Sequence, residues 1–85
     1  MNALIFKAVW CQPCKMMAPV YNKVLTEMKI DWVKIDVDED PDNTGKYEIT
    51  SVPCLILLDK DNVVAKLTGA IPPSKLLAMI KELNI

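Results

Sequence analysis

A change in hydrophobic period near residue 11 constrains the fold of this chain more than any other feature. Residues 3–9 are mostly apolar and β-prone, as in a strand that is covered on both faces. From Cys14 onward, apolar residues recur at helical spacing, with polar residues opposite. These apolar positions are Met17, Val20, Tyr21, Val24, Leu25 and Met28. The pattern predicts a strand leading into a helix, and Pro13 suits the first helical position because its missing N–H is not needed there.

The rest of the chain predicts a small sheet with two more helices. Strands are expected at residues 32–37, 55–58 and 63–67, a turn at 59–62, a short helix at 44–49, and a last helix from Pro72-Pro73. The order is β-α-β-α-β-β-α. A parallel first pair needs a right-handed helical crossover, and a hairpin supplies an antiparallel edge. We therefore predict an α/β fold with a four-stranded mixed sheet flanked by helices.

Length and composition limit the class of protein. A chain of 85 residues makes one domain, over residues 1–85, and 52% hydrophobic residues with only two glycines favour a compact globule. A net charge of −1 without a basic stripe gives no support for nucleic-acid binding. No apolar run approaches the roughly 20 residues of a membrane span, and residues 1–7 do not resemble a signal peptide. We expect a monomeric cytoplasmic protein.

The chain has three cysteines and no histidine. In a reducing compartment, such cysteines indicate chemistry or metal binding rather than a structural disulfide framework. Cys11 and Cys14 stand where the strand gives way to the helix, and free N–H groups and the helix dipole stabilise an anion there. Because the thiolate is the attacking species, this position activates Cys11 as an exposed nucleophile. Cys14, one turn into the helix, is expected to be shielded and to resolve a mixed disulfide.

Zinc binding is the alternative interpretation of the Cys-x-x-Cys spacing. A structural zinc ion needs four ligands, and one copy of this chain offers only one further cysteine, Cys54. A carboxylate or a second chain would have to complete the site, so we predict no metal. Cys54 begins a predicted buried strand and is expected to act as a small hydrophobe. The alternative for Cys54 is a regulatory or metal-binding thiol.

Several segments together resemble the thioredoxin family. Residues 10–19, Trp-Cys-Gln-Pro-Cys-Lys-Met-Met-Ala-Pro, are similar to its active-site segment, including the proline five residues after the second cysteine. Residues 34–38 resemble its central strand, residues 46–53 the stretch that ends in its cis-proline, and residues 68–70 the loop beside its active site. The resemblance covers nearly the whole chain. It is closest to trimmed, phage- or glutaredoxin-sized members that lack the family's first strand and helix.

The resemblance implies a role for each matching residue. Cys11 and Cys14 would be the catalytic pair. Pro53 would be the cis-proline that faces the sulfurs, and the backbone of Val52 would pair with an extended substrate segment. The other substrate-binding positions implied are Trp10, Gln12, Pro13 and Gly69. Of these, Trp10, Pro13 and Gly69 would form a flat apolar rim around Cys11.

The resemblance also implies an activity. The protein would reduce protein disulfides: Cys11 attacks, a mixed disulfide forms, and Cys14 resolves it. No bound cofactor is needed, and electrons would come from NADPH through a thioredoxin-reductase-like flavoenzyme. Two alternatives are a glutaredoxin-like protein recharged by glutathione and a thioredoxin-fold binding subunit.

Three positions depart from the family's pattern. Ile5 stands where the family usually carries a buried Asp, Lys7 where it carries Trp, and Gln12 where it carries Gly. In the family, the buried Asp is thought to help move the proton of the second cysteine. Lys34 resembles the lysine that accompanies this acid, and without the acid we expect its ammonium to reach solvent. The departures at Lys7 and Gln12 alter the surface that a reductase must bind.

Overall fold

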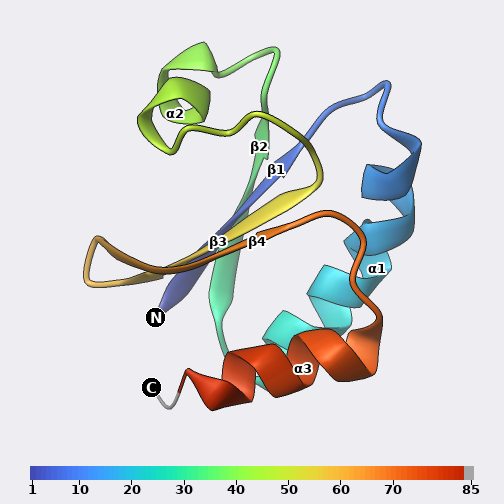
Figure 1. Cartoon of the computed structure of the whole chain (residues 1–85), viewed down its shortest axis with the longest axis vertical. Coiled ribbons are helices and arrows are strands. Elements are labelled where there is room, and N and C mark those ends of the chain that lie inside the picture. The colour runs from blue at the N-terminus through green and yellow to red at the C-terminus, as the bar shows by residue number, and fades with distance from the viewer. Residues whose placement is uncertain (84–85) are drawn as a thin grey trace.

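The computed structural model describes residues 1–83 and is built around one mixed sheet of four strands. The elements follow in the predicted order (Figure 1). They are β1 (Asn2–Lys7), α1 (Gln12–Glu27), β2 (Asp31–Asp36), α2 (Pro41–Lys46), β3 (Cys54–Asp59), β4 (Asn62–Thr68) and α3 (Pro73–Glu82). The predicted fold class is therefore confirmed, and the helix that was expected to start at Pro13 begins one residue earlier, at Gln12.

The sheet has the strand order β2-β1-β3-β4, so the first strand in the sequence lies in the interior of the sheet. β1 pairs in parallel with β2, through the crossover helix α1, and antiparallel with β3. β3 and β4 form the predicted hairpin, and Lys60 and Asp61 turn the chain between them. The end of β1 therefore lies between β2 and β3, with Lys7 paired to Asp36 and Phe6 to Cys54. These two strands fix the position of the residues that follow β1.

The two faces of the sheet bury separate apolar clusters. On one face, β1 and β3 pack against α1 and α3; Met17, Tyr21 and Leu76 are among the buried residues there. On the other face, Phe6, Ile35, Cys54, Ile56 and Leu58 form a second cluster that the segment after α2 covers in part. Covering on both faces explains the nearly continuous apolar runs of β1 and β3.

The position predicted for the short second helix was wrong. The helix spans Pro41–Lys46 rather than residues 44–49. Asp40 caps it by accepting hydrogen bonds from the backbone N and the Nδ2 of Asn43, at 3.1 and 2.9 Å. The Asn43 side chain, followed by its backbone N–H, holds the pKa of Asp40 below its ordinary value. Asp followed by Pro is a strong signal for the start of a helix, and the prediction of residues 44–49 did not use it.

Candidate active site

Cys11 and Cys14 form a disulfide at the junction between β1 and α1, with their Cα atoms 5.3 Å apart. Cys11 is the N-cap residue of α1, and its Sγ accepts a hydrogen bond from the backbone N–H of Cys14 at 3.2 Å. A free N–H at the positive end of a helix therefore points at the sulfur of Cys11. This geometry is compatible with the expected stabilisation of a Cys11 thiolate after reduction, which stays a prediction.

The prediction that Cys11 is exposed is wrong for the disulfide form. Cys11 is only 4% exposed and Cys14 7%. Both pack with Ala8 in a small apolar cluster, and Val37 and Val52 cover its sides. Cys11 does lie outside the helix, but its exposure is set by the segments at Val37 and Val52, which the sequence around the cysteines does not reveal.

The segment before β3 lies beside this cluster. The Val52–Pro53 peptide bond is cis, as predicted. Pro53 is buried, and its carbonyl accepts a hydrogen bond from the N–H of Gly69 at 2.8 Å. Gly69 has φ 91°, a left-handed conformation that favours glycine. The structure thus joins Pro53 and Gly69, and it places Val52 against the cysteines.

Val52 has the free backbone that a docking strand needs. Among residues 1–83, no other backbone group hydrogen-bonds to the N–H or the carbonyl of Val52. An extended segment that runs alongside can therefore pair with both groups. The predicted pairing role of Val52 is compatible with this geometry and stays a prediction.

A hydrogen bond that the sequence analysis missed fixes the indole of Trp10. The Nε1 of Trp10 donates to Oδ2 of Asp38 at 2.9 Å, across 28 residues of sequence. The indole is 67% exposed, so the bond holds a flat apolar surface beside Cys11 instead of burying it. Gln12 and Pro13 are also exposed, in the first turn of α1. No local spacing links Trp10 to Asp38, which explains why the pair went unnoticed.

A second missed contact ties the loop after Gly69 to the cysteine helix. The backbone N–H of Ile71 donates to the Sδ of Met17 at 3.4 Å. Met17 is 3% exposed and lies within α1, three residues after Cys14. The loop of residues 69–71 is therefore held at Gly69 by the carbonyl of Pro53 and at Ile71 by the sulfur of Met17.

The core behind the disulfide contains no ionisable group among residues 1–83 except the phenol of Tyr21. Ile5 is buried there, 5% exposed, in the same cluster as Met17 and Tyr21. The Tyr21 hydroxyl has no hydrogen-bond partner in the described part of the chain, and burial, with a smaller effect of Cys54, raises its pKa well above the ordinary value. Tyr21 therefore stays protonated, and the core holds no carboxylate.

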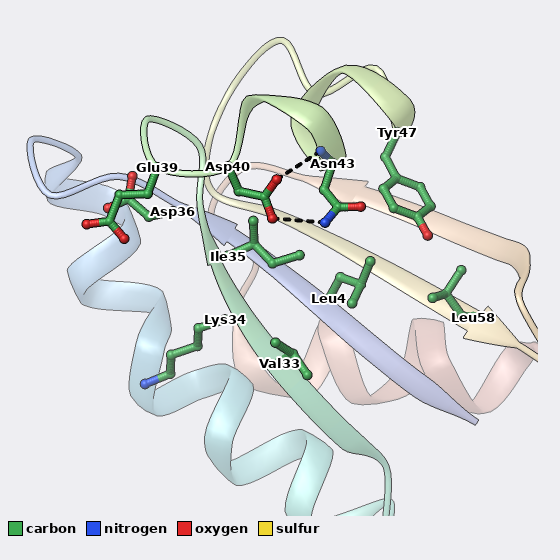
Figure 2. A pocket seen from close by; sticks show the side chains of 10 residues that line it. All are labelled: Leu4, Val33, Lys34, Ile35, Asp36, Glu39, Asp40, Asn43, Tyr47 and Leu58. Atoms are coloured by element: carbon green, nitrogen blue, oxygen red, sulfur yellow. Dashed lines mark hydrogen bonds between the residues drawn. The ribbon is translucent and has the colours of Figure 1, made fainter.

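The two lysines singled out in the sequence lie on the surface. Lys34 is exposed, as predicted, and Figure 2 shows its ammonium directed away from the neighbouring pocket. The Nζ of Lys7 lies 3.9 Å from Oδ2 of Asp36, across the pairing of β1 with β2. Lys7 therefore places a charge at the end of β1, where the family usually carries an indole.

Cys54 belongs to a different cluster from the reactive cysteines. It is fully buried, with Phe6 and Ile35 among its neighbours, and its Sγ lies 3.6 Å from Oγ1 of Thr68. We expect Cys54→Ala and Cys54→Ser to keep their turnover and to lose roughly 1–2 kcal/mol of unfolding free energy at most. Denaturant unfolding and a disulfide-reduction assay measure both quantities. A folded variant with strongly reduced turnover would place Cys54 in the mechanism.

A cavity of about 530 Å³ lies away from the cysteines. Figure 2 shows it on the face of the sheet beside α2, with Leu4, Ile35, Tyr47 and Leu58 around it. None of the predicted site residues lines this cavity. Among residues 1–83 there is also no cluster of three or more side chains suited to hold a metal ion.

Comparison with known proteins agrees with the geometry. The Thioredoxin family matches residues 2–82. Thioredoxin of Staphylococcus aureus is 42% identical over 79 residues, which cover 91% of this chain and 76% of that protein. Thioredoxin 1 of Thermosipho africanus superposes with a TM-score of 0.87 at 28% identity and covers 96% of this chain and 92% of its own.

The oxidised form of mitochondrial thioredoxin 3 from Saccharomyces cerevisiae is equally informative. It superposes with a TM-score of 0.84 at 36% identity, over 95% of this chain and 76% of its own. The match to the family spans almost the whole chain, and it includes the disulfide at the start of α1. The chain belongs to the thioredoxin family and is a thiol–disulfide oxidoreductase.

Proposed function

We propose that Cys11 is the attacking and Cys14 the resolving cysteine in the reduction of disulfides in other proteins. The Cys11 thiolate attacks one sulfur of the substrate disulfide, and the other substrate sulfur leaves and takes up a proton. Cys14 then loses its proton and attacks the Cys11 sulfur, which releases the second substrate thiol. Two electrons pass to the substrate, and the Cys11–Cys14 disulfide remains. The observation that carries this assignment is the Cys14 N–H donated to the Cys11 sulfur.

The surroundings of the disulfide support a protein substrate. Trp10 and Pro13 are exposed close to Cys11 in the chain, and Gly69 is bonded to Pro53, as a rim around Cys11 would require. The free backbone of Val52 is available for pairing with an extended chain. Strand pairing recognises the backbone and therefore accepts many sequences. Gln12 follows Cys11 and is exposed, so it adds a polar side chain to the surface around the disulfide.

We further propose that the cycle needs no bound cofactor and that electrons reach the disulfide from NADPH through a thioredoxin-reductase-like flavoenzyme in the cytoplasm. The segment Trp10-Cys11-Gln12-Pro13-Cys14-Lys15 supports this route over glutathione. No helix within residues 1–83 is long and apolar enough to cross a membrane.

A coupled assay distinguishes the two sources of electrons. The oxidised protein is supplied with NADPH and thioredoxin reductase in one series, and with NADPH, glutathione and glutathione reductase in the other. We expect faster turnover with the flavoenzyme, by a modest factor because Lys7 and Gln12 alter the docking surface. The opposite ranking would establish the glutaredoxin-like alternative.

A further inference from the structure

A small cavity adjoins the residues that cover the disulfide, although neither cysteine lines it. Its volume is about 270 Å³, below the usual range of a small-molecule site and suited to a single side chain. Val37, Ile49 and Val52 line it with apolar surface, and the exposed Trp10 forms one wall. The hydroxyl-bearing residues Thr44, Thr50 and Ser51 line the rest. Val37 and Val52 also cover the cysteine cluster. The cavity and the disulfide therefore share a wall.

Asp38 is the one ionisable side chain that lines this cavity within residues 1–83. Its Oδ2 accepts the hydrogen bond from Trp10, and its Oδ1 has no hydrogen-bond partner in the described part of the chain. Lys7 and Lys66 interact with other groups. Lys7 lies 3.9 Å from Asp36, and Lys66 donates to the carbonyl oxygens of Tyr47 and Glu48. The Asp38 carboxylate is therefore exposed in the lining of the cavity, and no cation within residues 1–83 pairs with it.

A second cavity near the cysteines has lining residues of the reverse charge. A cavity of about 350 Å³ beside Cys14 is lined by Lys7 and Lys15, and no carboxylate lines it. A substrate segment near the disulfide thus meets the negative Asp38 at one cavity and the positive Lys15 at the other, where Lys7 already lies beside Asp36. The two cavities therefore differ in the charge of the substrate side chain that they favour.

We infer that the cavity beside Trp10 is a subsite for a substrate side chain with an apolar stem and a cationic tip, an Arg or Lys close to the attacked cysteine. The inference rests on the proposed function and names its preferred substrate. The apolar walls accommodate the methylene groups, the indole face of Trp10 attracts a guanidinium, and the Asp38 carboxylate pairs with the charge. Because a strand that pairs with Val52 directs alternate side chains to opposite sides, one residue near the cysteine enters the cavity.

The test uses pre-reduced protein and three peptide disulfides that differ only in the residue beside the cysteine: Arg, citrulline or Glu. Citrulline has the shape of Arg without its charge. In single-turnover reactions at low salt we expect the Arg peptide to be reduced about 2–5-fold faster than the citrulline peptide, and the Glu peptide to be slowest. Added salt should remove the advantage of Arg, because the pair is exposed.

Two variants locate the effect. Asp38→Asn removes the charge but keeps an oxygen that can accept the Trp10 hydrogen bond, so the ratio of the Arg to the citrulline rate should fall to about 1. Glu39→Gln removes a charge from the next residue, which lines the separate cavity of Figure 2, and should leave the ratio unchanged.

The outcomes of these measurements separate the subsite proposal from the proposed disulfide reduction. Equal rates for the Arg and citrulline peptides in the parent would overturn the subsite and leave the disulfide reduction intact. An Arg advantage that survives in Asp38→Asn, or one that Glu39→Gln also abolishes, would place the recognition elsewhere. Failure to reduce any of the peptides would instead contradict the proposed function.

Discussion

Cys14→Ser is expected to accumulate covalent complexes with substrate proteins, whereas Cys11→Ser should form none. Cys11 sits at the helix N-terminus with a backbone N–H aimed at its sulfur, so it is the cysteine whose thiolate is stabilised. Without Cys14 the mixed disulfide cannot be resolved from within the protein. Both variants should lose disulfide-reducing turnover by at least about 10³-fold, because each removes a group that forms or breaks a bond.

Non-reducing gels of the two variants, incubated with a disulfide-containing protein, show the complexes as bands that vanish on addition of a strong reductant. Cys54→Ser serves as the control for the loss of a thiol, since Cys54 is buried in another cluster. Equal trapping by Cys11→Ser and Cys14→Ser would show that the two roles are not divided as proposed.

Ile5→Asp is expected to destabilise the fold by about 3–5 kcal/mol at pH 7. Ile5 is buried among Met17, Tyr21 and other apolar side chains, and no cation lies in this cluster among residues 1–83. Burial raises the pKa of an unpaired carboxyl group. Above about pH 4 the folded variant would then hold more protons than the unfolded chain, so its stability should fall as pH rises from there towards the raised pKa.

Denaturant unfolding of the parent and the variant at several pH values measures this difference. Ile5→Asn, which is polar without an ionisable group, should show a cost that does not change with pH, and Ile5→Val should lose only about 1 kcal/mol. In the parent, the pH–rate profile of the resolving step should lack an inflection from a buried acid. A stable Ile5→Asp together with such an inflection in the parent would show that another carboxylate serves Cys14.

The sheet and the cysteine pair were predictable because their signals are local or repeated. The period change after residue 9 and the apolar runs of β1 and β3 follow from covering on both faces, and Gly69 marks a turn that needs a left-handed conformation. The start of α2 was missed because the prediction did not use the Asp40-Pro41 cap.

The details of the site were not predictable for a different reason. The burial of Cys11 depends on Val37 and Val52, and the position of the Trp10 indole depends on Asp38. These partners are brought together by the fold, and a single sequence contains no spacing rule that joins them. The chemistry of the cysteines could therefore be inferred, but the shape and charge of the surface that selects a substrate could not.

The interior position of β1 has a consequence for how the chain folds. Asn2 pairs with Leu58, 56 residues later (58 − 2), whereas the hairpin of β3 and β4 closes over a few residues. Closing the long loop costs more entropy than closing the hairpin, so we expect the hairpin to form early and β1 to dock late. On the ribosome, β1 emerges before β3 and cannot complete its pairing in the sheet until β3 has been made. Its apolar side chains stay unprotected during that interval, which makes this strand the segment most open to chaperones and to misassembly.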